Sequence, residues 1–391
     1  MTRIITFLFL MFIQSFAVNA QNTLYDFINL GDFQVGFKDT ILFETNYQYE
    51  AFDYAGMKPH FIQIWYPLAQ KPNRPDYLTF KDFFEGNLTD TLFTIQAKLR
   101  QHYQEAIIRD CIEENLASCE ANDFGNLNNE EILNIIGETK TKSIIHKDFK
   151  TSQYPIIIYH HGAQSYSFEN YAMAEYFASR GFIFISANFH LPYENTIFGL
   201  KPFDKIIKDE EESSLQTILR FAKSLTTSES IFFIGHSWGA QMGLRTFDHD
   251  TAIKGLISLE TTIEFKTDKE IIKEMWPEVF QKVITENGIY PFPILFCAAT
   301  GQEKPFAFFD KINSPSVMFA PTKKEFEHNA YLSTFYLRLF LENNIQQTDR
   351  DILQDRLHLY VKYLELIDEF IDGILKNKHE SKSEIRFVKN E

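Results

Sequence analysis

The chain has 391 residues, and 38 Lys and Arg face 53 Asp and Glu, so its formal net charge is −15. This acidic surplus excludes a nucleic-acid-binding protein, which needs clustered basic side chains. Hydrophobic residues make up 45% and charged residues 23%, a balance that excludes a disordered chain. The length allows one large domain with insertions or two modest domains.

The first twenty residues have the pattern of a secretory signal peptide. Arg3 precedes an apolar stretch at 4–13, and a small-x-small triplet follows at 18–20. The apolar run is too short for a membrane-spanning helix, which needs about 20 residues. We expect cleavage after Ala20, a mature chain that begins at Gln21 without a stable membrane span, and a secreted or periplasmic location. The alternative is an uncleaved anchor.

The part of the chain before residue 150 predicts two strands and an insertion. Residues 33–44 and 61–66 have the pattern of antiparallel strands that lead into a sheet. Residues at about 80–150 are polar and favour helix, so we expect a helical insertion there. Cys111 and Cys119 lie in it, and an oxidising compartment would let them form a disulfide.

From residue 154 onward, short apolar runs alternate with helical patterns. One helix is expected to start at Ser167 as N-cap and to end at Gly181, and two more cover 215–225 and 239–247. A crossover between parallel strands needs a helix, so the pattern predicts an α/β fold, a mostly parallel sheet with helices on both faces. The apolar runs expected as strands are 154–159, 182–187, 231–234, 256–259, 294–299 and 317–320.

The segment at about 262–290 predicts a second insertion. Its apolar stripe includes Trp276 and Phe280 on a helix that is kinked or restarted at Pro277. This stripe could cover a pocket as a lid, or it could pack in the core. After Lys376 the chain is charged, and we expect a frayed end.

The motif Gly235-His236-Ser237-Trp238-Gly239 directly follows the expected strand 231–234 and precedes a helix. This is G-x-S-x-G between a strand and a helix, the pattern of a nucleophilic serine on a sharp turn. Such a turn leaves the hydroxyl exposed above the sheet, and glycines avoid collisions with the neighbouring backbone. Free N–H groups at the start of the helix can stabilise an oxyanion.

The sequence resembles the α/β-hydrolase superfamily. Three segments carry this resemblance: the Gly235–Gly239 turn, called the elbow below, the segment HHGA at 160–163 and the run IQIWYP at 62–67. Together they are most similar to platelet-activating-factor acetylhydrolase-like and dienelactone-hydrolase-like esterases. The resemblance implies an α/β-hydrolase domain over 21–391 with the two insertions. We expect no cofactor and no metal, because no metal-type spacing of Cys and His occurs and His160 and His161 point to opposite faces of a strand.

An acyl-transfer serine needs N–H donors aimed at the oxyanion. One donor is expected to be the backbone N–H of Trp238, the residue after the nucleophile. By the pattern of the superfamily the second is Ala163, with Gln164 as its neighbour. The alternative is that HHGA only forms a tight turn.

In this fold the general base is a histidine that follows the last strand. His249 is too close to Ser237 in sequence, His358 lies in a long amphipathic helix, and His379 lies in the charged tail. His328 remains, in the loop before a helix expected from Tyr331. The alternative is that His328 is an ordinary surface histidine.

The acid of the triad is expected to be Glu260, directly after the strand 256–259. The acetylhydrolase-like branch places its acid after this strand, whereas most α/β-hydrolases place it after the next one. There Glu303 is the rival, with Asp310 further along. The carboxylate must hold the tautomer of His328 and stabilise the imidazolium.

These residues predict a secreted serine ester hydrolase that forms an acyl-enzyme on Ser237. The expected substrate is a small-molecule or lipid ester, and the acyl length and the oligomeric state stay open. A lipase or an amidase could use the same triad. The other alternative is a catalytically silent hydrolase scaffold that acts as a binding protein.

Overall fold

The computed structural model describes fourteen stretches of the chain: 23–69, 74–86, 92–109, 127–145, 149, 152–163, 165–192, 205–260, 273–274, 276–299, 309–322, 326–340, 347–378 and 384–388. The predicted signal peptide at 1–20 lies outside the described residues. So do Cys111 and Cys119, Gln164 and the rival acid Glu303. No helix within the described ranges combines the length and the apolar character needed to cross a membrane.

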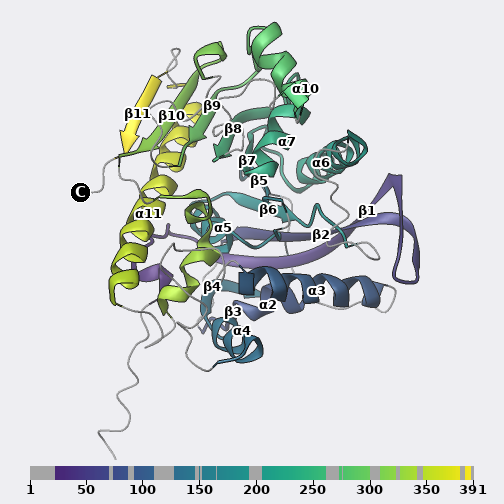
Figure 1. Cartoon of the computed structure of the whole chain (residues 1–391), viewed down its shortest axis with the longest axis vertical. Coiled ribbons are helices and arrows are strands. Elements are labelled where there is room, and N and C mark those ends of the chain that lie inside the picture. Colours follow the sequence, from purple (N-terminus) through teal and green to yellow (C-terminus); the bar gives the residue numbers. More distant parts are fainter. Residues whose placement is uncertain are drawn as a thin grey trace, which may run out of the picture.

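The described residues form one eleven-stranded sheet in the order β11-β10-β9-β8-β7-β5-β6-β2-β1-β4-β3 (Figure 1). From β11 to β6 each neighbouring pair is parallel, while β2 is antiparallel to both β6 and β1. The predicted α/β class is confirmed. The strands are β1 (Gln34–Ala51), β2 (Tyr54–Leu68), β3 (Tyr77–Thr79), β4 (Lys140–Ile145), β5 (Ile156–His160), β6 (Ile183–Ala187), β7 (Ile231–His236), β8 (Ile253–Leu259), β9 (Ile294–Cys297), β10 (Ser316–Pro321) and β11 (Glu384–Val388).

The central strands are buried on both faces, because alternate side chains enter two different cores. On β5, Ile157 and Tyr159 belong to one apolar cluster, and Ile156 and Ile158 belong to the other. The first cluster includes side chains of α3, α5 and α11, and the second includes side chains of α6, α7 and α10. This arrangement explains why the parallel strands are continuous apolar runs in the sequence.

Helices cover the sheet on both faces. The α-helices are α2 (Lys81–Glu85), α3 (Phe93–Ile108), α4 (Asn129–Gly137), α5 (Tyr171–Ser179), α6 (Lys205–Leu225), α7 (Trp238–Thr246), α10 (Pro277–Phe280) and α11 (Gln347–Leu375). Short 3-10 turns span Leu24–Asp26, Phe309–Lys311, His328–Tyr331 and Ser333–Phe340, and a π-turn spans Gln281–Thr285.

The first insertion is only partly helical. It contains α2, α3 and α4 as expected, but it also supplies β4, which pairs in parallel with β1. The insertion thus contains the helices that its sequence favours and one strand that was not expected. The first four residues of β4, Lys140 to Ser143, are all polar, so the strand has no continuous apolar run, and its partner β1 lies about a hundred residues earlier.

Three other boundaries differ from the sequence expectations. α5 begins at Tyr171 with Asn170 as N-cap, because the hydroxyl of Ser167 donates to Gln63 Oε1 at 2.8 Å instead of capping a helix. His328 itself opens a 3-10 turn, ahead of the helix expected from Tyr331. The end of the chain is not entirely frayed, because residues 384–388 form β11 against β10.

The described part of the second insertion packs in the core. Pro277 is the first residue of α10, so the helix restarts there. Trp276 and Val279 are each 1% exposed, and the Trp276 ring lies 4.7 Å from the ring of Trp238. Residues 261–272 are outside the described ranges, so whether they form a lid stays open. Cys297 on β9 is buried, as expected.

Candidate active site

Ser237 occupies a strained turn between β7 and α7. Its backbone has φ 52° and ψ −115°, a conformation that residues other than glycine rarely adopt. A Cβ on Gly235 would lie less than 3.0 Å from the Ala240 nitrogen, and a Cβ on Gly239 less than 3.0 Å from the main chain of His160. Both glycines of the motif are therefore required by close backbone packing.

Backbone hydrogen bonds hold this turn at the end of the parallel strands. The N–H of Ser237 donates to the carbonyl of Leu259 at 3.0 Å, and the Ser237 carbonyl accepts from the Ala240 N–H at 3.1 Å. Ser237 is 7% exposed and directly precedes the first residue of α7. The hydroxyl thus sits beside the N–H groups at a helix start, where a negative charge is stabilised.

Glu260 and His328 are brought together beside the elbow. Glu260 follows β8 with φ 43° and is fully buried, and its N–H donates to the Cys297 carbonyl at 2.8 Å. Its carboxylate accepts a hydrogen bond from Nδ1 of His328. Because a carboxylate only accepts, this contact leaves His328 Nε2 as the unprotonated nitrogen of the neutral ring. Burial lowers the pKa of His328 to about 4, which keeps the ring neutral at neutral pH.

His236 connects His328 to the turn of Ser237. The rings of His236 and His328 lie 4.5 Å apart, and His236 Nε2 donates to the His328 carbonyl at 3.2 Å. Burial, together with the neighbouring His328, keeps the pKa of His236 well below its usual range. His236 precedes Ser237 in the chain, so this contact positions the segment of His328 against the elbow.

The loop after β5 borders the same turn. A Cβ on Gly162 would lie 3.0 Å from Nδ1 of His236 and 3.5 Å from Cβ of Ser237. Ala163 is the next residue and is exposed, and Trp238 is the first residue of α7. Both predicted oxyanion donors therefore lie next to this turn. Ala163 follows Gly162, which packs against Ser237, and Trp238 follows Ser237 itself.

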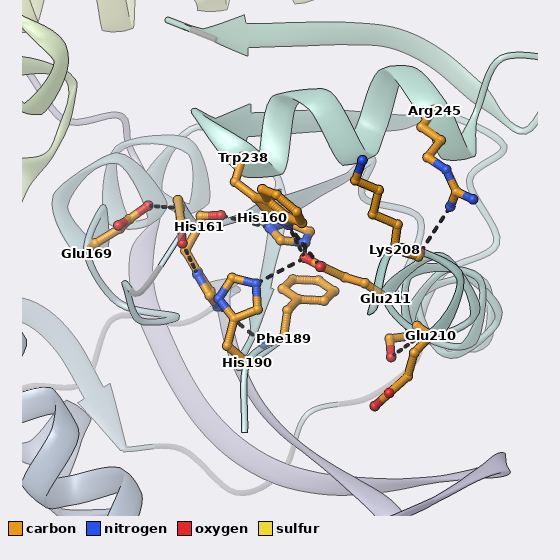
Figure 2. A network of polar contacts seen from close by, with 12 residues as sticks. His160, His161, Glu169, Phe189, His190, Lys208, Glu210, Glu211, Trp238 and Arg245 are labelled. Carbon is orange, nitrogen blue, oxygen red and sulfur yellow. Dashed lines mark hydrogen bonds and ion pairs between the residues drawn. The ribbon is translucent and has the colours of Figure 1, made fainter. Parts of the chain in front are cut away.

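A buried carboxylate supports the elbow from the side of α6 (Figure 2). Glu211 accepts from the indole N–H of Trp238 at 2.9 Å, and it lies 2.5 Å from His160 Nε2 and 3.2 Å from His190 Nε2. Burial alone would raise the pKa of Glu211, but His190 and His160 hold it well below its usual range. Glu211 thereby fixes the indole of the residue whose N–H was predicted as an oxyanion donor.

Sequence reasoning found the residues next to Ser237 but missed this supporting carboxylate. Glu211 lies in the acidic run 209–212, which in sequence looks like a solvated helix face. The weak available signal was the helical spacing of α6, which places Glu211 on the same side as the buried Leu215. Of the alternative acids, Asp310 is exposed in the turn Phe309–Lys311, which packs against Gly288 ahead of β9, away from His328.

Metal ligation is not indicated in the stretches that the structure describes. No group of three or more His, Cys, Asp and Glu side chains is arranged there to hold a metal ion. The buried histidines His160 and His190 instead contact Glu211, and His161 accepts from the Phe189 N–H at 3.2 Å.

Neither a protein-family model nor a curated protein matches the sequence. Among solved structures, the chain is similar to a ferulic acid esterase from Streptomyces cinnamoneus, with a TM-score of 0.55 and 13% identity over 87% of this chain and 91% of that chain. It also matches brefeldin A esterase, a bacterial homologue of human hormone sensitive lipase, with a TM-score of 0.40 and 11% identity over 86% of this chain and 82% of that one. A third match is a dienelactone hydrolase-like promiscuous phosphotriesterase from metagenomic libraries, with a TM-score of 0.33 and 12% identity over 56% of this chain and 89% of that one.

Proposed function

This chain has the α/β-hydrolase fold, and from that premise we propose that it is a serine hydrolase that cleaves carboxylic esters. Ser237 is the nucleophile, His328 the general base and Glu260 the acid that orients the base. The observation that carries the proposal is the contact between Glu260 and His328 Nδ1 beside a serine held at φ 52°. A serine, a histidine and a carboxylate are the three groups that act together in acyl transfer.

The reaction begins with attack of Ser237 Oγ on the carbonyl carbon of the ester. His328 Nε2 takes the hydroxyl proton, and Glu260 stabilises the imidazolium that forms. The N–H groups of Trp238 and Ala163 donate to the oxyanion of the tetrahedral intermediate. His328 then gives its proton to the leaving alcohol, and an acyl-enzyme remains on Ser237.

A water molecule completes the cycle. His328 accepts a proton from this water, whose oxygen attacks the acyl carbon, and the collapse of the second intermediate returns the proton to Ser237 and releases the acid. Each proton therefore moves between the substrate, water, Ser237 and His328. No cofactor takes part in these steps.

The substrate class is a small-molecule or lipid ester, as in a carboxylesterase or an acetylhydrolase-like enzyme. The enzyme acts in the periplasm or outside the cell after cleavage near Ala20, as one α/β-hydrolase domain over 21–391. These statements rest on the signal-peptide pattern and on the resemblance of the elbow, HHGA and IQIWYP segments to acetylhydrolase-like esterases.

Fluorophosphonate labelling tests the nucleophile. Wild-type protein should be modified at Ser237, and Ser237→Ala should lose labelling and several orders of magnitude of p-nitrophenyl ester hydrolysis. Ser224→Ala is the matched control, because Ser224 is an exposed serine on α6 whose hydroxyl only contacts the Phe221 carbonyl. Hydrolysis retained by Ser237→Ala, or wild-type protein that is not labelled, would contradict the proposal and favour a silent scaffold.

Two amide variants test the acid. Glu260→Gln should lower kcat strongly, because the amide no longer stabilises the imidazolium of His328. Glu303→Gln should leave kcat close to the wild-type value. The opposite result, a large loss for Glu303→Gln and little for Glu260→Gln, would transfer the role to Glu303.

A further inference from the structure

A second fully buried carboxylate, Glu169, lies under the loop after β5. Its Oε1 accepts from the N–H of Gly162 at 3.2 Å and from the hydroxyl of Tyr159 at 2.5 Å. Its other oxygen accepts from the hydroxyl of Ser165. Gly162 and Ser165 flank Ala163 in the chain, so one carboxylate ties down both sides of the segment that carries the predicted second oxyanion donor.

Glu169 and its neighbour Asn170 also contact the segment that carries His328. The main-chain carbonyl of Glu169 accepts from the Ser333 hydroxyl at 3.0 Å and from the Thr334 N–H at 3.1 Å. Asn170, which is 2% exposed, accepts through Oδ1 from the Ser333 N–H at 3.0 Å and donates to the Tyr159 hydroxyl at 2.8 Å. Ser333 opens the 3-10 turn that directly follows the turn of His328.

These contacts form one connected set between two walls of the candidate active site. On one side are Gly162 and Ser165, and on the other is the segment 328–334. Glu169 Oε1 also lies 3.8 Å from Nδ1 of His236, the residue before the nucleophile. Glu169 is shielded from solvent and accepts hydrogen bonds from three donors. Together these bonds fix its carboxylate more firmly than one hydrogen bond between neutral groups would.

We propose that Glu169 is a positioning residue that holds the oxyanion loop at a fixed place relative to Ser237 and to the segment of His328. The inference rests on the proposed hydrolase function. Glu169 acts through Gly162 and Ser165, which donate hydrogen bonds to its carboxylate. An N–H donor that is displaced by a fraction of an ångström stabilises the oxyanion less, whereas binding of the uncharged ester is little affected.

The chain contains a matched comparison for this carboxylate. Glu175 on α5 is also fully buried and also accepts three hydrogen bonds, from the hydroxyl of Ser143 at 2.5 Å, from the N–H of Lys142 at 2.9 Å and from the hydroxyl of Tyr25. Its partners lie in β4 and in the N-terminal 3-10 turn. Burial raises the pKa of Glu175 to about 7. Glu175→Gln therefore disturbs a buried, hydrogen-bonded carboxyl group at a place that borders no predicted catalytic residue.

The test compares Glu169→Gln with Glu175→Gln in full-length mature protein. For Glu169→Gln we expect kcat to fall roughly 10- to 100-fold and KM to change by less than about 3-fold. The inhibition constant of a trifluoromethyl ketone, which forms an oxyanion on the serine, should rise by the same factor as kcat falls. Glu175→Gln should keep both values within about 2-fold, even if both variants lose similar thermal stability.

A purely structural role for Glu169 would give a different result. If kcat of Glu169→Gln stays at the wild-type value, or if both amide variants lose activity only in proportion to their unfolded fraction, the proposal is wrong. Should Glu169→Gln fail to fold, Ser165→Ala removes one of the three donors without changing a buried charge. It should show the same split between kcat and KM with a smaller amplitude, and a normal kcat would again contradict the proposal.

Failure of this inference is separable from failure of the proposed function. Wild-type protein that is not labelled at Ser237 by fluorophosphonate would overturn the hydrolase assignment, and the role of Glu169 would fall with it. Wild-type protein that is labelled and active, together with a Glu169→Gln variant of normal kcat and normal ketone affinity, would overturn only the positioning role.

Discussion

At the scale of single residues, the shape of the elbow is set by atoms that leave no room for a side chain. The space at Gly239 is filled by the main chain and ring of His160, whose own Nε2 is held by Glu211. The glycine, the histidine and the carboxylate therefore act together on the position of Trp238. A change at any one of them is expected to move the N–H of Trp238.

Gly239→Ala tests this packing. The new methyl group would overlap His160, so we expect a loss of roughly 1–3 kcal/mol of stability and a fall in kcat of about 100-fold or more. Gly373→Ala on α11 is the control, because a Cβ there meets no atom within 4 Å. It should stabilise the protein by up to about 1 kcal/mol and leave kcat unchanged. Urea unfolding and steady-state kinetics measure both effects, and a fully active Gly239→Ala would show that the packing is dispensable.

The pH dependence of kcat/KM reports on His328. A base must be neutral to accept the proton of Ser237, and burial lowers the pKa of His328 from its ordinary value of 6.5 to about 4. Activity should therefore stay near its maximum down to about pH 5 and fall to half its maximum only as the pH reaches about 4. A profile measured on a pH-insensitive ester, with folding followed in parallel by circular dichroism, checks this. Half-maximal kcat/KM at or above pH 7 would contradict it.

The positions of the residues around Ser237 could be predicted from the sequence, whereas the buried carboxylates that support them could not. Ser237, Trp238 and Glu260 directly follow strand ends, so the strand pattern alone locates them on one edge of a parallel sheet. Glu169 and Glu211 come from a turn and from a helix, and only tertiary packing turns these acidic side chains inward. Burial of a charged group is decided by partners far away in sequence, which no local pattern records.

At the scale of secondary structure elements, the first insertion forms one wall of a cavity. The cavity has a volume of about 420 Å³ and lies between α2, α3 and the β1–β2 pair. Ser167, which follows the loop of Ala163, also lines it. Phe61 on β2 accepts from the N–H of Asn188, just past the end of β6, so the cavity lies at the same edge of the sheet as Ser237. Its apolar lining includes Ile41, Phe61, Phe83, Phe84, Leu99 and Tyr103.

We expect this cavity to receive the distal apolar part of large esters. Leu99→Trp would fill it, so kcat/KM for long-chain or aryl esters should fall about 10-fold or more, while that for p-nitrophenyl acetate should change little. Ile135→Trp on α4 of the same insertion is the control, because Ile135 is 40% exposed. A series of p-nitrophenyl esters of increasing acyl length provides the measurement. An equal effect on all esters would show that the cavity takes no part in selectivity.

The strands at the centre of the sheet were predictable from their apolar runs, whereas β4 and β11 were missed. The runs that became β5, β6 and β7 are apolar at nearly every position. β4 and β11 lie toward the two edges of the sheet and contain exposed polar residues, so they look like helix or coil in sequence. Pairing with a neighbour, not local preference, makes them strands.

At the scale of the whole molecule, export is expected to shorten the chain. Protein recovered from the periplasm or the medium should begin at Gln21, because the apolar run and the triplet at 18–20 match a cleaved signal peptide. Mass spectrometry of the intact protein measures this, including cyclisation of the terminal glutamine. Full-length protein that starts at Met1 and stays in the cytoplasm would refute the signal-peptide prediction.

The order of strands in the sheet has a consequence for how the chain reaches its native state. Most pairings among β5 to β10 join strands that are consecutive in the sequence, although β7 pairs with β5 and not with β6. By contrast, β2 must reach β6 across the whole first insertion. Such distant pairings slow folding, because loop-closure entropy is lost before the new contacts form. We therefore expect the β1–β2 hairpin to dock late, and until then the open edge of β6 is the place where two nascent molecules could pair with each other and aggregate.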